Sequence, residues 1–183
     1  RGVSSGDKGV FLSDRVAWEA AKGAPFTLIL EDDAVPMSFL PPRHGDRGDH
    51  EEAFLQLCCG RWASLWTALL EATKALEARK VDWHLLLLGR HRFGADSPID
   101  GEHDLVAAGF STCLHAYCVS NSGAELLLRL TELDHSKDSA FSHLIPIDDL
   151  LPGLWSGQHP RRDLEEYLKK HLPGHDLRVV AFR

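Results

Sequence analysis

The segment Thr27-Leu28-Ile29-Leu30-Glu31-Asp32-Asp33-Ala34 passes from an apolar run to three consecutive acids. The apolar part is rich in leucine and isoleucine and follows Pro25, a pattern that predicts a buried strand of a parallel sheet. Adjacent carboxylates at a strand end repel one another and are poorly solvated. A divalent cation would remove that repulsion, and open α/β sheets bind ligands beyond the carboxyl ends of their strands. The alternative is a solvated acidic turn that caps the next element.

The composition fits one soluble globular domain spanning residues 1–183, with 44% hydrophobic and 26% charged residues. A net charge of −7 disfavours a nucleic-acid-binding surface. The purely apolar stretches are too short to predict a transmembrane span. Because the first residue is Arg1, we expect a processed product or an excised fragment, so any targeting segment could lie outside this sequence.

Hydrophobic periodicity predicts helices and strands in alternation along the chain. Residues 36–50 and 91–108 are polar or rich in turn-forming residues and predict loops. Helices are expected over 9–22, 51–80, 124–133 and 163–171, the second with a possible break at Gly60, and strands over 26–31, 82–90, 113–119 and 177–182. This alternation is typical of an α/β fold with a mostly parallel sheet.

The first acidic cluster has the spacing of a metal site. Residues two apart in an extended chain point to the same side, so Glu31 and Asp33 can reach one cation together. Asp32 would point away from that cation or touch the ligand differently. Oxygen ligands of this kind suit Mg²⁺ or Mn²⁺ bridging a diphosphate.

A second acidic pair, Asp148 and Asp149, lies between Pro146 and Pro152. A carboxylate in a partly apolar setting has a raised pKa and can act as a general base. The alternative is that one of the pair is the N-cap of a short helix over 149–154. Both roles can coexist in one pair.

Two further positions could contact a diphosphate. Gly89-Arg90 follows the second apolar strand and could place a cation near a phosphate, although a plain strand-to-loop turn with a surface arginine is the slightly favoured alternative. His159, before Pro160, could bind a metal or the diphosphate, but a single histidine is more often structural. No Walker loop, nucleophile elbow or GxGxxG motif is present.

Taken in order, several blocks of this sequence resemble glycosyltransferase family 25, which includes procollagen and lipo-oligosaccharide galactosyltransferases. The last block, with the His-Pro that follows it and the Ala181-Phe182 ending of the chain, is more similar to the procollagen branch than to the bacterial one. The matching blocks are Lys8 to Ser13 with Trp18, Leu28 to Ala34, Asp82 to Arg90, Phe110 to Thr112 with Ala116 to Ser120 and Gly123-Ala124, Ile145 to Pro152, and His159-Pro160.

The resemblance implies a GT-A type, Rossmann-like α/β/α sandwich that takes UDP-galactose as donor and depends on Mn²⁺. It implies transfer with inversion to a hydroxyl acceptor, which in the procollagen branch is hydroxylysine of a collagen-like protein in the endoplasmic reticulum lumen. On this basis we expect the metal at Glu31, Asp33 and His159, the donor near Asp32, Gly89 and Arg90, and the base at Asp148 or Asp149.

The sequence also departs from the family pattern. Asp14 follows Ser13 where the family usually has histidine, and the chain begins after the family's first strand and stops at Arg183, before the expected tail. We therefore expect a truncated domain. Two alternatives stay open: a non-catalytic binding or adhesion module, and a transferase for a glycan acceptor.

Overall fold

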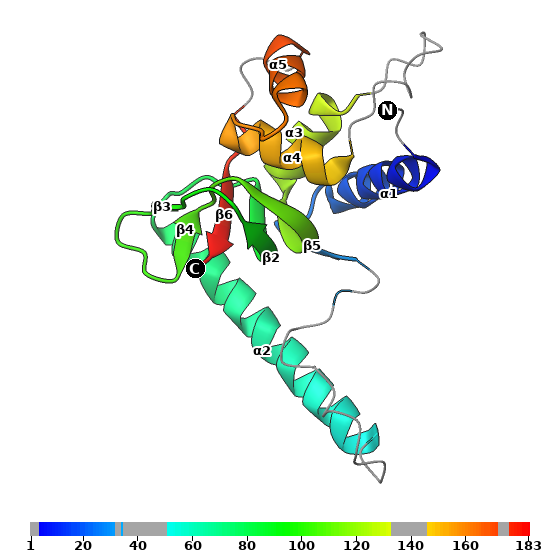
Figure 1. Cartoon of the computed structure of the whole chain (residues 1–183). Helices are drawn as coiled ribbons and strands as arrows, with labels where there is room; N and C mark the ends of the chain where they lie inside the picture. Colours follow the sequence, from blue (N-terminus) through cyan, green and yellow to red (C-terminus); the bar gives the residue numbers. More distant parts are fainter. Residues whose placement is uncertain (1–3, 32–33, 35–50, 133–145, 172–175) are drawn as a thin grey trace. The chain divides into compact units, whose positions relative to one another are not determined.

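The computed structural model describes residues 4–31, 34, 51–132, 146–171 and 176–183 (Figure 1). The chain divides into two units, Asp33–Asp82 and the remainder, Arg1–Asp32 with Trp83–Arg183. The first of these contains helix α2 (Glu51–Ala78), which continues through Gly60, where the sequence allowed a break. The loop expected over 36–50, like Asp32 and Asp33, lies outside the described residues.

The larger unit is built on a six-stranded mixed sheet. The order across the sheet is β1-β5-β2-β6-β4-β3, and among these described strands only β2 and β6 pair in parallel. The strands are β1 (Phe26–Leu30), β2 (Leu85–Arg92), β3 (Ser97–Pro98), β4 (Leu105–Ala107), β5 (Ser111–Ser120) and β6 (Val179–Phe182). The α/β class is confirmed.

The expectation of a mostly parallel sheet is wrong. Residues 91–108, expected to form a loop, carry the end of β2 and the short strands β3 and β4, and no helix connects β2 to β5. A parallel pair needs a long crossover, usually helical, whereas a chain that returns without one pairs antiparallel. The apolar runs show only that the strands are buried, because Leu85, Leu86 and Leu87 are each at most 1% exposed.

The strand directions nevertheless bring the carboxyl ends of three strands to one edge of the sheet. Both β1 and β2 are antiparallel to β5, which lies between them, and β6 is parallel to β2. The strands β1, β2 and β6 therefore run the same way, and their carboxyl ends lie at one edge of the sheet.

Helix boundaries follow capping residues more closely than hydrophobic periodicity. Helix α1 (Ser5–Ala21) begins earlier than predicted because Ser4 and Asp7 form a capping box. Helix α3 (Asn121–Leu130) begins where the Ser/Asn cluster predicts, with the Ser120 hydroxyl accepting from the Gly123 amide. Helices α4 (Ile147–Ser156) and α5 (Arg162–His171) complete the unit.

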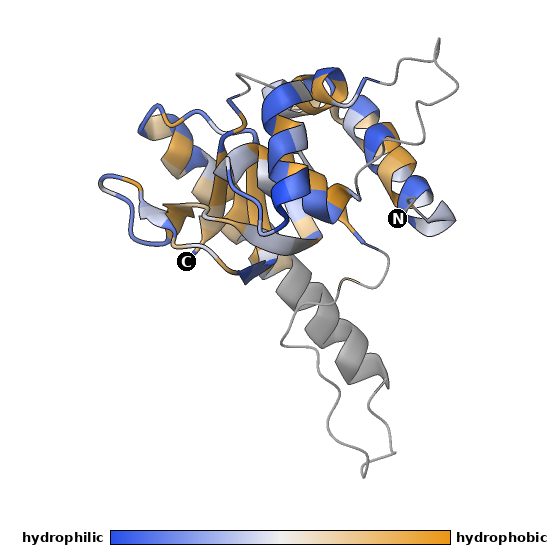
Figure 2. Cartoon of the chain, turned by 45° about the horizontal axis from the view of Figure 1, so that its top comes forward, coloured by the Kyte–Doolittle hydropathy of each residue, from blue (hydrophilic) through white to orange (hydrophobic). Residues whose placement is uncertain are grey.

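The core lies between the sheet and α1, α3 and α4, which pack against β5 on one face. Hydrophobic residues dominate the strands, whereas the helices mix hydrophobic and hydrophilic residues (Figure 2). The close packing is visible at Gly123, where an added Cβ would lie 2.3 Å from the His84 carbonyl oxygen. Any larger residue would push α3 away from the start of β2.

A buried polar chain links α1 to the sheet. The Trp18 indole donates to the Tyr117 hydroxyl at 3.0 Å, and that hydroxyl donates to Asp14 Oδ1 at 2.8 Å. Burial raises the pKa of Asp14 to about 6, and the charges of Glu31 and Asp148 add to the effect, while the Tyr117 hydrogen bond opposes it. Asp14 therefore carries an electrostatic cost when it is ionised.

We expect Asp14→Asn to stabilise the fold at pH 7. The pKa of Asp14 is higher in the folded chain than in the unfolded chain, so its favourable contribution is complete at low pH and is lost as pH rises through about 6. Asparagine keeps an oxygen for the Tyr117 hydroxyl and carries no charge. The gain should be at most about 3 kcal/mol. Thermal melts from pH 4 to pH 7, with a chelator present, should show a flatter pH dependence for the variant. An unchanged pH dependence would contradict this.

Candidate acidic site at the sheet edge

Glu31 directly follows the last residue of β1, at the edge of the sheet where β2 also ends. Ala116 of β5 pairs with Leu30 on one side and with Gly89 on the other, so Glu31, which follows Leu30, lies at the level of the Gly89-Arg90 block in the sheet. The Glu31 amide donates to the His115 carbonyl oxygen at 2.9 Å, and the two side chains form an ion pair when His115 is protonated. This contact holds the Glu31 carboxylate beside β5.

Asp148 lies in the same neighbourhood. It occupies the first turn of α4, and its Oδ1 accepts from the Leu114 amide of β5 at 3.3 Å. Burial raises its pKa, the Leu114 hydrogen bond opposes this, and the charge of Glu31 raises the pKa further. Since Glu31 and Asp148 also raise the pKa of Asp14, three carboxyl groups from distant parts of the chain repel one another here.

Sequence reasoning treated Asp14 only as a departure from a family pattern and missed that it joins this cluster. A signal was present: Asp14 is four residues before the fully buried Trp18, so the two lie on the same face of α1. His115, two residues before the buried Tyr117 on β5, was also missed.

Asp149 faces different partners. Its carboxylate lies 3.6 Å from His159 Nε2 and 3.8 Å from Arg161 Nη1. Neither acid of the pair is the N-cap of α4, because the helix begins at Ile147 and Pro146 occupies the cap position. Both acids instead lie in the first turn, where the helix dipole stabilises negative charge.

His159 is held with its ring almost fully buried, at 2% side-chain exposure. Its Nδ1 accepts from the Arg161 amide at 3.0 Å, so in the neutral ring the proton is on Nε2. That Nε2 atom is buried without a hydrogen-bond partner among the described residues, and it faces Asp149. With Nδ1 used as an acceptor and Nε2 protonated, the ring offers no lone pair to a metal ion in this arrangement.

Arg90 is engaged in a buried ion pair. Its guanidinium donates to both oxygens of Asp96, each at 2.8 Å, and to the Ser111 hydroxyl at 2.9 Å. Both side chains of the pair are 8% exposed, and Arg90 holds the pKa of Asp96 well below its usual range. The arginine therefore joins the end of β2 to the loop before β3.

Within the part of the chain that the structure describes, no three His, Cys, Asp or Glu side chains are grouped as metal ligands. Of the three expected metal ligands, Glu31 lies in the acidic cluster and His159 lies beside Asp149. The third, Asp33, lies outside the described residues. Over the same described ranges, no helix is long and apolar enough to cross a membrane.

Comparison with known proteins relates the chain to one family. It is 27% identical over 186 aligned positions to procollagen galactosyltransferase 1 of Danio rerio, covering 99% of this chain and 24% of that protein. It is 29% identical over 187 positions to inactive glycosyltransferase 25 family member 3 of Homo sapiens, covering 100% of this chain and 24% of that protein. Procollagen galactosyltransferase 2 of Mus musculus is 23% identical over 91% of this chain and 22% of its own length.

No family model and no solved structure matches the chain. The chain spans about a quarter of the length of the curated relatives it matches. The similarity extends over essentially the whole of this chain both in a protein named as a galactosyltransferase and in one named as inactive. The chain is therefore distantly homologous, over essentially its whole length, to proteins of glycosyltransferase family 25.

Proposed function

We propose that this chain is part of a metal-dependent inverting galactosyltransferase with a GT-A type fold, which transfers galactose from UDP-galactose to a hydroxyl acceptor. The observation that carries the proposal is the meeting of Glu31 and Asp148 at the edge where β1 and β2 end. Family membership supports the nucleotide-sugar donor. Because the chain covers about a quarter of the length of its relatives, the proposal carries over an activity of proteins much longer than this sequence.

Asp148 is the stronger candidate for the general base. Transfer with inversion needs one group to take the proton of the attacking hydroxyl, and a carboxylate with a raised pKa does this more readily than an ordinary one. The pKa of Asp148 is raised by burial and by Glu31. Asp149 instead lies against His159 and Arg161, which suits a residue that fixes the start of α4.

Glu31 and Asp33 are the proposed ligands of Mn²⁺ or Mg²⁺, with Asp32 touching the donor. The repulsion among Asp14, Glu31 and Asp148 fits a nearby cation, because a positive charge would lower the cost of ionising all three. A bound divalent cation would stabilise the departing diphosphate. The orientation of His159 does not support it as a ligand.

The proposed donor contact of the Gly89-Arg90 block is made mainly by its main chain. The Arg90 charge is balanced by Asp96, so a phosphate would have to compete for that guanidinium. The main chain at Gly89, one strand away from Leu30, is the part of this block best placed for the donor. The proposed acceptor is hydroxylysine of a collagen-like protein in the endoplasmic reticulum lumen, or a glycan hydroxyl.

A second candidate function is a non-catalytic binding module. It is favoured by the relatives named inactive or probably inactive, which align over the whole of this chain with 27% to 29% identity. Asp14 in place of the family's usual histidine agrees with it. Both functions use the same fold, so only donor binding and turnover separate them.

We expect Asp148→Asn in the full-length protein to reduce galactose transfer from UDP-galactose by about a hundredfold to ten-thousandfold, because the proton acceptor is lost. The thermal melt should stay the same or rise, since burial already disfavours the charged carboxyl. Asp163→Asn, which removes a fully exposed acid on α5, is the matched control and should leave transfer unchanged.

Transfer assays with Mn²⁺ and a hydroxylysine peptide would be combined with calorimetric titration of UDP. Full activity in Asp148→Asn would remove this residue from the mechanism. A wild-type protein that neither binds UDP nor transfers galactose would support the non-catalytic module.

The two nitrogens of His159 can be tested separately. His159→Asn keeps an acceptor near the Arg161 amide and removes the donor facing Asp149, whereas His159→Gln can keep that donor. We expect the glutamine variant to retain more transfer activity than the asparagine variant. Nitrogen-15 NMR of the wild-type ring should show the proton on Nε2. A proton on Nδ1, or equal activity in the two variants, would contradict the assigned orientation.

A further inference from the structure

His115 of β5 lies beside the acidic cluster and is neither a proposed metal ligand nor a proposed base. The register of β1 against β5 places Glu31, the residue after Leu30, opposite His115. The Glu31 amide donates to the His115 carbonyl oxygen at 2.9 Å, so the two residues form a cross-strand pair. The side chains of such a pair lie on the same face of the sheet.

That face of the sheet is the one that α1 and α4 cover. Tyr117, two residues further along β5, points to the same side as His115, and its hydroxyl donates to Asp14 of α1 at 2.8 Å. At the start of α4, burial raises the pKa of Asp148, and the charge of His115 is one of the influences that lower it. His115 therefore lies among the acids of the cluster.

One side-chain hydrogen bond joins His115 to Glu31. Nδ1 of the ring lies against Oε2 of the carboxylate. Because an ionised carboxylate can only accept, the proton of this bond is on Nδ1. No hydrogen-bond partner of the other oxygen, Oε1, is found among the described residues. The Glu31 carboxylate is therefore oriented through one oxygen and keeps the other for a further bond.

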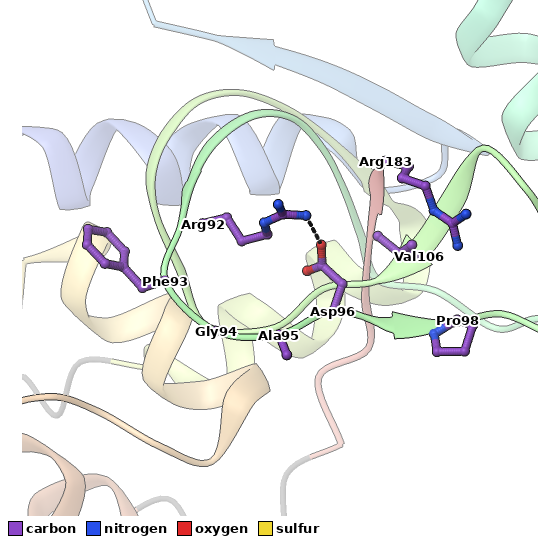
Figure 3. A pocket seen from close by; sticks show the side chains of 8 residues that line it. All are labelled: Arg92, Phe93, Gly94, Ala95, Asp96, Pro98, Val106 and Arg183. Atoms are coloured by element: carbon purple, nitrogen blue, oxygen red, sulfur yellow. Dashed lines mark hydrogen bonds and ion pairs between the residues drawn. The ribbon is translucent and has the colours of Figure 1, made fainter.

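Asp96, the acid that lines the pocket after β2, has no such capacity. Arg92 donates to it at 3.2 Å, as the dashed line in Figure 3 shows. Arg90 donates to both of its oxygens, and the Gly109 amide donates to one of them. Each oxygen of Asp96 thus has two donors, and two arginines balance its charge, so a cation has no place there. Glu31, which a single imidazole holds, differs in both respects.

We propose that His115 positions the Glu31 carboxylate for the divalent cation of the transferase. The ring donates to Oε2 and leaves Oε1 to bind the ion. A hydrogen bond to a ligating carboxylate fixes its orientation, and removal of such a partner weakens metal binding by about 10-fold to 100-fold. The inference rests on the proposed role of Glu31 as a metal ligand. His115 acts through Glu31 and is a positioning residue.

The alternative is an ordinary surface pair. The side chains of His115 and Glu31 are 52% and 38% exposed, and exposed pairs of this kind contribute little to stability. A merely structural pair would leave the metal affinity unchanged when the histidine is replaced. A protonated ring that repels the cation would have the opposite effect, so its removal would tighten metal binding. The direction of the change in Mn²⁺ affinity separates these three roles.

The test compares Mn²⁺ binding by the full-length wild-type protein and its variants at pH 8, with the free ion counted by electron paramagnetic resonance. We expect His115→Leu to weaken binding by about 10-fold to 100-fold, because Glu31 loses its donor. Asparagine places an amide nitrogen near the position of Nδ1, so His115→Asn should keep most of the affinity. In transfer assays, His115→Leu should raise the Mn²⁺ concentration needed for half-maximal rate and leave kcat at saturating Mn²⁺ unchanged.

His103→Leu is the matched control. It removes an exposed histidine from the loop between β3 and β4, at the other edge of the sheet from β1, and should leave Mn²⁺ binding unchanged. Thermal melts should agree among the histidine variants, because the replaced side chains are exposed. Unchanged or tighter Mn²⁺ binding in His115→Leu, or an equal loss in His115→Asn, would overturn the positioning role.

Glu31→Gln distinguishes a failure of this inference from a failure of the proposed metal site. The variant should abolish the component of Mn²⁺ binding that His115→Leu weakens. If Glu31→Gln left Mn²⁺ binding unchanged, the proposed metal site would be wrong and the role of His115 would be wrong with it. A loss in Glu31→Gln without a loss in His115→Leu would reject the role of His115 alone.

Discussion

The pairing of β5 with both β1 and β2 is the constraint on which the site depends. Because β5 runs opposite to each neighbour, β1 and β2 must point the same way, and their ends must meet at one edge. The register then sets the spacing, since Ala116 pairs with Leu30 and Gly89 on its two sides. A slip of one residue in the β1–β5 pair would send Glu31 to the opposite face of the sheet.

The acidic cluster is assembled at a cost to stability. Asp14 comes from α1, Glu31 from the end of β1 and Asp148 from the start of α4; Glu31 raises the pKa of both aspartates, and Asp148 raises that of Asp14. The hydrogen bonds from Tyr117 and from the Leu114 amide offset only part of that cost. Carboxyl groups whose pKa values are raised by burial and by neighbouring charges are typical of functional sites. Arg90 and Asp96 show the opposite arrangement, because the two charges of this buried pair neutralise each other and stabilise the turn after β2.

Much of the fold could be predicted from the sequence, because it depends on local patterns. Apolar runs located β1, β2, β5 and β6, and the Ser/Asn cluster located the start of α3. Strand direction could not be predicted, since a run such as Leu85 to Leu88 is buried equally well in a parallel or an antiparallel sheet. The short strands β3 and β4 were missed because Ser97–Pro98 and Leu105–Ala107 are too short to show alternation.

Site residues could be predicted where the local sequence alone marked them. Their contacts with residues from distant segments of the chain could not be predicted. Glu31 and Asp148 were identified from their own neighbours in sequence. The separation of Asp148 from Asp149 needed the fold, because their different partners, Leu114 for one and His159 for the other, are set by how α4 packs on β5. The burial of Arg90 likewise depended on Asp96, in a stretch whose structure the sequence did not indicate.

The most direct test is whether Glu31 and Asp148 interact electrostatically. Carbon-13 NMR would follow the titration of the Asp148 carboxyl in the metal-free wild-type chain, in Glu31→Gln, and in Glu125→Gln as a control on α3. The pKa of Asp148 should lie above 3.8 in the wild type, fall when Glu31 loses its charge, and stay constant in the control. An Asp148 pKa that is unaffected by Glu31→Gln would show that the two acidic segments do not converge, and the transferase site proposed for this edge would be wrong.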